Sequence, residues 1–432
     1  MSRIVDIKVH HVTRVEGHGS IRVKAEDGTI EKVEWQVPEA PRFFEAMVRG
    51  RMWDEIQPIV SRICGICSVS HSLTALKAVE DALGVEISEQ TGKLRLLTHY
   101  SEQLESHSLH VGYLVAPDLF GVKSVLPLAS SHPDELKMII AIHRVANTWT
   151  ELLAGRITHP VALKPGGFTK LPTESDLKQL KQMLEQIVPN LEKTAGLVQS
   201  VSDKLPDFER ETEYVALVKT GAYPFYNGNI GSTDTHETVD AHQFESVANE
   251  YVCPQSTAKW TKWHRDSYAV GALARYNLNA DYLLPLAAKT AKAFGLEKGC
   301  CNPYMNSVVQ VVECVQVVEH AVQIIDELLT AGIKPEKLNV KPRAGTGVGC
   351  TEAPRGILFH KYTFDDSGKC VSGNICIPTN QNHGNIQKDF EVLVPQILDR
   401  GQDEIRLMLE MLVRAYDPCI SCSTHFMDVE FV

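Results

Sequence analysis

The sequence predicts a mainly α-helical fold with small β portions, an α+β protein built around one large helical body. Apolar residues recur at helical spacing from about residue 45 onward. Strand-like alternation is confined to an N-terminal β region at about 1–40 and to a Gly/Pro-rich β-hairpin insertion at about 341–390. No linker or internal repeat divides the chain, so residues 1–432 are expected to form a single large domain.

The N-terminal β region is predicted from alternating apolar and polar residues. Residues 4–12 alternate, and residues 21–25 lead through Asp27-Gly28 into residues 29–35. An Asp-Gly pair between two alternating runs favours a tight turn between paired strands. We therefore expect a strand followed by a β-hairpin.

Four segments predict long helices. Residues 94–115, 174–205 and 404–415 carry apolar stripes, and Pro189 is expected to bend the second of them. Residues 308–329 are rich in Val, but their polar residues recur at helical spacing. This last segment is predicted to be a helix that is buried on most sides.

The Gly/Pro-rich insertion at about 341–390 is predicted to form a second hairpin. Residues 356–363 and 369–377 flank a turn at Asp366-Ser-Gly368. The sequence Gly345-Thr-Gly-Val-Gly lacks the spacing and the strand-to-helix setting of a dinucleotide-binding loop, so a nucleotide site is not expected.

Composition restricts the compartment and the partners. The net charge of −11, from 43 Lys and Arg against 54 Asp and Glu, argues against nucleic acid or an anionic membrane as a partner. The chain opens without a secretory pattern, and no apolar run reaches the roughly 18 residues of a membrane span. We expect a cytoplasmic protein with reduced thiols, because an odd count of eleven cysteines does not suit a secreted disulfide framework.

Two Cys-x-x-Cys pairs stand near opposite ends of the chain, and they suggest one soft-metal centre. Cys64 and Cys67 form the first pair, and Cys419 and Cys422 form the second. Their separation is far larger than in zinc ribbons. Spacing alone leaves three interpretations open: a shared metal centre, separate structural roles, or redox thiols. The other seven cysteines are expected to be small buried hydrophobic residues.

The residues around these pairs closely resemble the signature segments of the large subunit of nickel–iron hydrogenases, in that family's order. The resemblance extends over nearly the whole chain and is most like the cytoplasmic, cofactor-coupled groups. The segments that carry it are Arg14-Val-Glu-Gly-His-Gly, Arg62-Ile-Cys-Gly-Ile-Cys-Ser-Val-Ser-His, Gly155-Arg-Ile-Thr-His-Pro, Glu352-Ala-Pro-Arg-Gly and Asp417-Pro-Cys-Ile-Ser-Cys-Ser-Thr-His.

The resemblance implies a nickel–iron site that splits H2 reversibly. All four cysteines would bind nickel, and Cys67 and Cys422 would also bridge to an iron that carries cyanide and carbon monoxide. Cys64 and Cys419 would bind nickel alone. Soft thiolates suit both metals, and a bound metal deprotonates the thiols.

The expected charge of this site predicts a cation beside it. Four thiolates, two cyanides and two divalent metals leave about −2, and a cation about 4 Å away is worth on the order of 4 kcal/mol. We expect Arg355 to be this cation, because its fork of donors can reach cyanide nitrogens. Thr379 is a second candidate cyanide donor, and Asp417 is expected to orient Arg355.

Heterolytic cleavage also needs a base for the proton. A terminal thiolate, Cys419, is the expected base, and Glu16 is expected to relay the proton outward. His71 follows Cys67 by four residues, so on a helix its ring would share a face with that sulfur and hydrogen-bond it.

Further roles follow from the same resemblance. Glu45 and His425 resemble ligands of a separate magnesium or iron site. Arg156 and His159 are expected in supporting or packing roles, and Asp118 is a candidate lining residue of a gas pocket.

The resemblance also implies partners. The chain holds no cysteine pattern for an electron-carrying cluster, so an iron–sulfur small subunit is expected. Diaphorase, ferredoxin-linked or heterodisulfide-type subunits are expected to accept the electrons. Nickel-insertion factors and a maturation protease are expected too; residues 426–432 resemble a short form of the removable tail. An H2-sensing regulatory protein, a structural component like that of respiratory complex I and a zinc scaffold are the alternatives.

Overall fold

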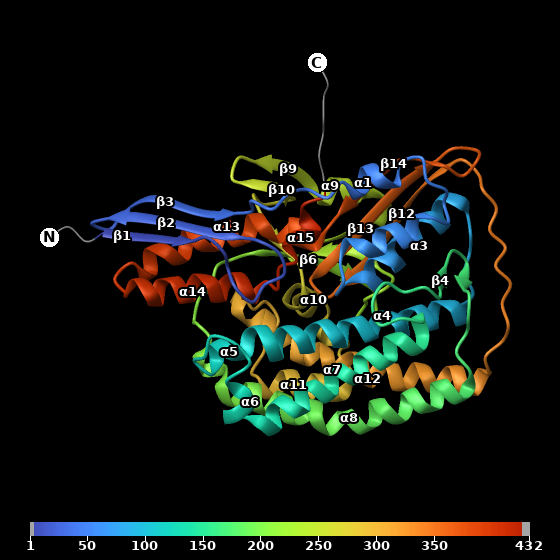
Figure 1. Cartoon of the computed structure of the whole chain (residues 1–432), viewed down its shortest axis with the longest axis horizontal. Helices are drawn as coiled ribbons and strands as arrows, with labels where there is room; N and C mark the ends of the chain where they lie inside the picture. Colours follow the sequence, from blue (N-terminus) through green and yellow to red (C-terminus); the bar gives the residue numbers. More distant parts are fainter. Residues whose placement is uncertain (1–3, 426–432) are drawn as a thin grey trace, which may run out of the picture.

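The structure, a computed structural model, describes residues 4–425 and has two layers (Figure 1). Long helices lie side by side in the lower layer of the view. The upper layer combines sheets and helices, and it contains α3 (Ser68–Leu83) and α15 (Ile420–Ser423), the two helices that follow the cysteine segments. The expected role of residues 426–432 as a removable tail lies outside the described residues.

The helical layer contains three of the four helices that the sequence predicts, those at 94–115, 174–205 and 308–329. The fourth, predicted at 404–415, is α14 (Gln402–Ala415), which packs on the N-terminal sheet instead. The helix predicted at 94–115 begins earlier and continues as a π-helical turn, His110–Val115. The helix predicted at 174–205 ends in a 3₁₀ turn, Ser202–Lys204. The main helices of this layer are α4 (Glu89–Leu109), α7 (Pro133–Ala154), α8 (Glu174–Val201), α11 (Pro285–Ala293) and α12 (Asn306–Ala331).

Among the described residues, α12 and the turn before it form a helix, Pro303–Ala331, that is long and apolar enough to cross a membrane by length and composition. The sequence shows no uninterrupted apolar run of that length, because Gln and Glu residues break the apolar stretches of α12. In the structure 78% of the most apolar window is buried, and α4, α8, α10 (Ala272–Asn279) and α11 pack against the helix. Its apolar character is therefore explained by the protein core.

The N-terminal β region forms a three-stranded antiparallel sheet, as predicted. Its strands are β1 (Ile4–Val9), β2 (Ser20–Glu26) and β3 (Thr29–Gln36), and Asp27-Gly28 makes the turn. Val9 pairs with Ile21, and alternate residues of β1 and β2 are buried. The buried face packs on α13 (Pro378–Ile397) and α14 (Gln402–Ala415), at the left of Figure 1.

The predicted second hairpin is present, but it belongs to a larger sheet. β13 (Gly356–Phe364) pairs with β14 (Cys370–Cys376), and β12 (Gly345–Ala353) adds a third strand that was not predicted. The β portion also ends before residue 390, because Pro378 starts α13. The buried side chains of α13 are largely polar, so no apolar stripe marks it as a helix.

The glycines of β12 bring this strand against α3. A Cβ at Gly347 would lie 2.2 Å from the Ala78 carbonyl, and one at Gly349 would lie 1.9 Å from the Thr74 carbonyl. The Gly-rich motif therefore serves close strand–helix packing.

Strands are not confined to the two ends of the chain. A four-stranded sheet lies in the middle of the sequence, and its central strand β6 is buried almost throughout, so it shows no alternation. The strands that were not predicted there are β4 (Leu163–Lys164), β5 (Gly167–Phe168), β6 (Glu213–Val218), β7 (Asn229–Ser232), β8 (Thr235–Val239), β9 (Asn249–Cys253), β10 (Ser256–Lys262) and β11 (Tyr268–Ala269).

Short helices connect these parts. They are α1 (Phe44–Val48), α2 (Ile56–Val60), α5 (Ala116–Leu119), α6 (Leu128–Ser131) and α9 (Phe244–Val247), with 3₁₀ turns at Ser61–Ile63, Ala241–Gln243, Ala280–Tyr282 and Pro303–Met305.

Of the seven cysteines outside the two pairs, four are buried as expected, and Cys253, Cys300 and Cys301 are half-buried.

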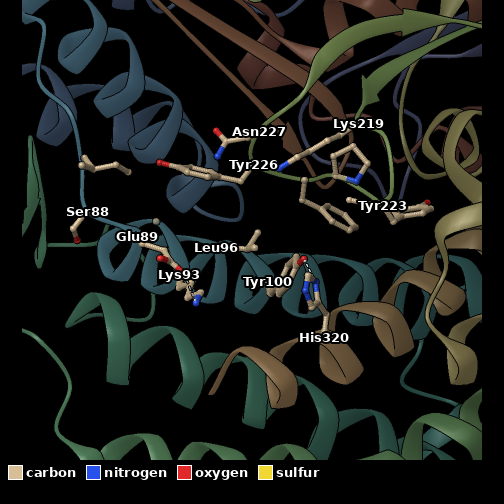
Figure 2. Close-up of a pocket in the computed structure, with 15 residues that line it drawn as sticks. Ser88, Glu89, Lys93, Leu96, Tyr100, Lys219, Tyr223, Tyr226, Asn227 and His320 are labelled. Atoms are coloured by element: carbon tan, nitrogen blue, oxygen red, sulfur yellow. Dashed lines mark hydrogen bonds and ion pairs between the residues drawn. The ribbon is translucent and has the colours of Figure 1, made fainter. Parts of the chain in front are cut away.

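A surface groove of about 440 Å³ lies between α4 and residues 219–227 (Figure 2). Aromatic rings line it, and the Tyr100 hydroxyl lies 2.7 Å from His320 Nδ1. The residues that line this groove include none of the predicted site residues. The predicted chemistry therefore lies elsewhere, in the protein interior.

Candidate metal centre

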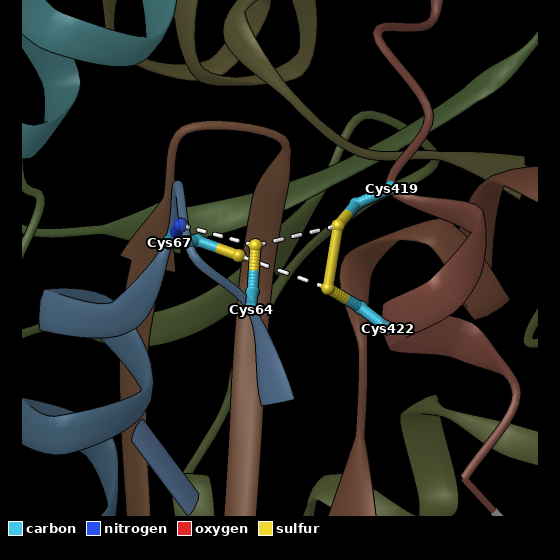
Figure 3. A group of neighbouring side chains, drawn as sticks. All are labelled: Cys64, Cys67, Cys419 and Cys422. Atoms are coloured by element: carbon cyan, nitrogen blue, oxygen red, sulfur yellow. Dashed lines mark hydrogen bonds between the residues drawn. A yellow bond between two sulfur atoms is a disulfide. The ribbon is translucent and has the colours of Figure 1, made fainter. Parts of the chain in front are cut away.

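The four cysteine sulfurs meet at one buried point (Figure 3). Cys64 Sγ lies 3.6 Å from Cys419 Sγ, and Cys67 Sγ lies 3.8 Å from Cys422 Sγ. All four sulfurs lie within 4.8 Å of one another. The two ends of the chain therefore converge in the way that a shared metal centre requires.

The first pair is held at the beginning of α3. Cys67 is the residue before this helix, and the N–H groups of Val69 and Ser70 donate to the Glu102 carboxylate at 2.5 and 3.0 Å. Burial raises the pKa of Glu102 to about 8, although these hydrogen bonds oppose the shift. Glu102 was not predicted as a site residue, because one acidic residue in a helical stripe carries no signal of its own.

Cys419 and Cys422 are joined by a disulfide in this structure, whereas Cys64 and Cys67 are thiols (Figure 3). Thiolates are the form of cysteine that binds metals, so the second pair must be reduced before all four sulfurs act as ligands. The hydrogen bond between the two thiols lowers the pKa of Cys64 and raises that of Cys67. Arg355 favours ionisation of both thiols.

Arg355 is buried beside the cysteines and has one nitrogen without a partner among residues 4–425. Its Nε donates to the Asp417 carbonyl at 2.7 Å, and its Nη2 donates to Asp417 Oδ1 at 3.0 Å. Nη1 is buried and makes no hydrogen bond with the described residues. Burial opposes the charge, but Asp417, Cys67 and Cys64 outweigh it and raise the pKa of Arg355.

The unpaired Arg355 Nη1 shows whether the expected metal group suits this site. A buried donor without an acceptor costs about 1–3 kcal/mol. An anionic ligand on a metal between the sulfurs would supply the missing acceptor. The four sulfur donors therefore fit a soft metal such as nickel, and the unpaired guanidinium nitrogen fits an anionic ligand on that metal.

Asp417, the residue that is predicted to orient Arg355, accepts two of its hydrogen bonds and is itself held in place. Its backbone φ of 49° places the residue in the left-handed region just before the second cysteine pair. Gln310 Nε2 donates to Asp417 Oδ2 at 3.1 Å, and His110 Nε2 lies 3.9 Å from Oδ1.

Glu16 lies against the second cysteine segment. Residue 16 forms an isolated parallel β-bridge with Cys419, and its carbonyl accepts from the Ile420 N–H at 3.0 Å. The Glu16 carboxylate accepts from the Ser421 N–H at 3.1 Å and is partly exposed. At the next residue, Gly17, a Cβ would lie 2.7 Å from the Ser421 nitrogen, so only glycine permits this close approach.

Thr379 contacts the second cysteine pair, and His71 belongs to the helix that follows the first. The Thr379 hydroxyl oxygen accepts from the Cys419 N–H at 2.9 Å, so its own proton can be donated elsewhere. His71 Nδ1 lies 3.1 Å from His360 Nε2, and burial lowers the pKa of His71 to about 3. The ring is therefore neutral at physiological pH.

Glu45 and His425 meet, as a second metal site would require. Glu45 Oε1 lies 3.4 Å from His425 Nε2. The Ile375 N–H donates to Glu45 at 2.8 Å, and the Ile375 carbonyl lies 2.7 Å from His425 Nε2. A carboxylate, an imidazole and a carbonyl thus converge, and His425 Nδ1 lies 3.0 Å from the Cys422 carbonyl.

Two of the remaining candidates, Asp118 and His159, have structural partners. Asp118 pairs with Arg414 Nε at 2.7 Å and with Arg14 Nη2 at 2.5 Å. His159 Nδ1 lies 2.8 Å from the Ser61 carbonyl, beside the first cysteine segment, and Arg156 is exposed.

Known proteins match both the sequence and the fold. A family profile described as nickel-dependent hydrogenase matches residues 42–147 and 222–425, and a profile described as HoxL-like matches residues 6–40. The alpha chain of sulfhydrogenase 1 from Pyrococcus furiosus is 33% identical over 97% of this chain and 97% of its own length. The alpha chain of sulfhydrogenase 2 from the same organism is 30% identical over 97% of this chain and 99% of its own length.

A solved structure gives the same result for the fold. An NAD+-reducing NiFe-hydrogenase in the H2-reduced state superposes with a TM-score of 0.88 at 26% identity, over 97% of this chain and 99% of that chain. The predicted fold, a mainly helical body with an N-terminal β region, is confirmed by this match.

Proposed function

This chain belongs to the nickel-dependent hydrogenase family, and from this premise we propose that it is the catalytic large subunit of a nickel–iron hydrogenase that cleaves H2 heterolytically and reversibly. The observation that carries the proposal is the convergence of four buried sulfurs from both ends of the chain. The whole chain, 1–432, is proposed to act as one catalytic domain.

The reduced cysteines hold the metals in this proposal. All four cysteines would hold nickel, and Cys67 and Cys422 would also hold an iron that carries cyanide and carbon monoxide ligands. Four soft thiolates in a closed pocket are the donor set that such metals prefer. When bound, the metal pair polarises H2 and accepts its electrons.

Arg355 and Thr379 bind the cyanides in this proposal. The unpaired Arg355 Nη1 supports this role, since it is the one guanidinium nitrogen of that residue without an acceptor among residues 4–425. Asp417 accepts from the other two nitrogens and so fixes the direction of the third. The Thr379 hydroxyl is similarly fixed by the Cys419 N–H.

The proton leaves through Cys419 and Glu16. The Cys419 thiolate accepts it, and the Glu16 carboxylate passes it outward. The bridge between these two residues and the partial exposure of Glu16 support this route. His71, whose ring is held by His360, is proposed to donate to the Cys67 sulfur and so stabilise its bridging role.

Glu45 and His425 are proposed to bind a magnesium or iron ion with the Ile375 carbonyl. The convergence of these three groups supports the site. Because His425 Nδ1 lies 3.0 Å from the Cys422 carbonyl, an ion bound to His425 would also anchor the second cysteine segment.

An iron–sulfur small subunit is the proposed electron acceptor, and cytoplasmic diaphorase, ferredoxin-linked or heterodisulfide-type subunits are proposed beyond it. Exposed Ile157 and Val161 support a docking face beside the first cysteine pair. A Cβ at Gly65 would contact Thr158, so this face would lie close to the metal site. Nickel-insertion factors and a protease are proposed for maturation.

Metal analysis with infrared spectroscopy tests this function. The purified protein should contain nickel and iron together and show the bands of bound carbon monoxide and cyanide. It should also exchange H2 with D2O. Zinc alone, without these bands, would instead identify a structural scaffold, and metals with bands but negligible turnover would identify a sensor.

A further inference from the structure

Arg275 of α10 is a fully buried arginine whose five N–H groups are all used. Its Nε and Nη2 donate to the two oxygens of Glu313, both at 2.6 Å. Its Nη1 donates to Glu352 at 3.0 Å. The remaining N–H groups donate at 3.1 Å to the carbonyls of Ala353 and Pro354, the two residues before Arg355.

The acids that hold Arg275 are themselves fixed. Glu313 also accepts from the Tyr223 hydroxyl at 2.7 Å and faces His107 Nε2 at 2.8 Å. The Glu352 carboxylate accepts from the Leu217 N–H at 2.6 Å. Arg275 therefore has one orientation, because both carboxylates are held by a second contact.

The other side of Arg355 is equally restricted. Gly356 has φ of 133°, and a Cβ there would lie 2.4 Å from Val270. The peptides on both sides of Arg355 are thus fixed. Ala353 pairs with Gly356 in the β12–β13 hairpin, and Arg275 adds a hydrogen bond to each of the two carbonyls that precede Arg355. Neither Arg275 nor Glu313 stood out in the sequence.

We propose that Arg275 is a positioning residue, which fixes the Ala353 and Pro354 carbonyls and so aims Arg355 Nη1 at the cysteine cluster. The inference rests on the proposed role of Arg355 at the metal centre. A buried ion network that only stabilises the fold would have no effect specific to this segment, so the two roles can be separated by experiment.

Arg275→Lys is the test variant, because lysine keeps the charge but cannot make the five-donor fork. Arg95→Lys is the matched control. Arg95 is equally buried and pairs with Glu80 through both terminal nitrogens at 2.7 and 2.5 Å, and its other hydrogen bonds go to the Tyr226 hydroxyl and the Lys164 carbonyl rather than to residues 352–356. Both variants should lose stability.

Two measurements on the purified protein discriminate the roles. Amide hydrogen exchange of residues 352–357 should accelerate by about tenfold or more in Arg275→Lys relative to Arg95→Lys, as expected for a lost hydrogen bond. The cyanide infrared bands should shift in Arg275→Lys alone, and its H2 turnover should fall by about 10–100-fold. Equal exchange in both variants with unshifted bands would overturn the proposal.

A second, milder pair of variants gives the same test if Arg275→Lys does not fold. Tyr223→Phe removes one hydrogen bond from Glu313. Tyr100→Phe is its control, because the Tyr100 hydroxyl lies in the same groove but contacts His320 and not the Arg275 network. The first should raise exchange at 352–357 and the second should not; no difference between them contradicts the proposal. A wild-type protein without nickel or cyanide bands would refute the proposed function alone, since the exchange comparison needs no metal.

Discussion

At the residue scale, the charges around the cysteines explain the choice of side chains. The metal centre is proposed to carry about −2 within the protein, and Arg355 is a buried cation whose Nη1 has no acceptor among residues 4–425. Lysine would keep the charge but not the two contacts to Asp417 that fix its direction. Geometry, more than charge, therefore makes arginine necessary here.

Glu16→Gln should separate proton transfer from metal binding. Glutamine still accepts from the Ser421 N–H but cannot carry a proton, so H2/D2O exchange should fall by about 10²–10⁴-fold. Nickel and iron contents should stay at the wild-type level. Glu39→Gln is the control, because Glu39 accepts the nearby His18 N–H at 2.8 Å and has no proposed catalytic role. Normal exchange in Glu16→Gln would exclude the relay.

The Arg275 network predicts a pH dependence of stability. Burial favours protonated Glu313, but Arg275 and His107 outweigh it and lower the pKa of Glu313 to about 2, from an ordinary value of 4.5. A lowered pKa means that the stabilisation is complete well above pH 4.5 and is lost as the pH falls towards 2.

Glu313→Gln measures this contribution. At pH 7 the free energy of unfolding of the variant should be about 3–5 kcal/mol lower than that of wild type, because Arg275 loses the Glu313 carboxylate. The difference should shrink below about pH 4.5, as measured by chemical denaturation across the pH range. A difference that stays constant down to about pH 3 would show that Glu313 is not the titrating group.

At the element scale, the close packing of β12 on α3 links the fold to the site, because α3 begins next to Cys67. Gly349→Ala would place a methyl group 1.9 Å from the Thr74 carbonyl, so the strand and helix must separate. We expect a loss of about 1–3 kcal/mol from overpacking and a lower nickel content.

Gly196→Ala is the matched control for this substitution. Gly196 lies in α8 with no heavy atom of the described residues within 4 Å of an added Cβ, so alanine there should stabilise the protein slightly. Thermal unfolding and nickel analysis of the two variants provide the measurement. Equal stability of both would contradict the packing account.

The elements that the sequence predicts best are those with a clear period. Residues 308–329 show helical spacing despite their Val content, and residues 4–12 and 21–35 show alternation around a turn. α13 was missed because its buried side chains are polar and find backbone partners, such as the carbonyls of Lys259 and Ser423 that accept from the Asn380 amide. β6 was missed because both of its faces are buried.

For the whole molecule, the sequence predicted which residues meet but could not supply the contacts that hold them. The four cysteines and Arg355 stand in short motifs, so their roles could be inferred. Glu102, Gln310 and Arg275 support them from distant helices and have no local signature, because they act only through tertiary packing.

Closing the loop between the two cysteine pairs costs roughly 5 kcal/mol of chain entropy, and metal binding offsets this cost. Cys419→Ser should therefore lose nickel and release the C-terminal segment. Limited proteolysis should cut near residues 417–425 in this variant faster than in Cys376→Ser, whose buried cysteine lies outside the cluster. Equal cleavage of both would argue against a metal-dependent closure.

Nickel K-edge X-ray absorption of the purified protein tests the central claim most directly. We predict a nickel environment of four sulfur ligands with an iron neighbour, lost in Cys419→Ser. Nickel bound mainly by nitrogen and oxygen, or two separate ions each held by one cysteine pair, would contradict a shared centre built from both ends of the chain.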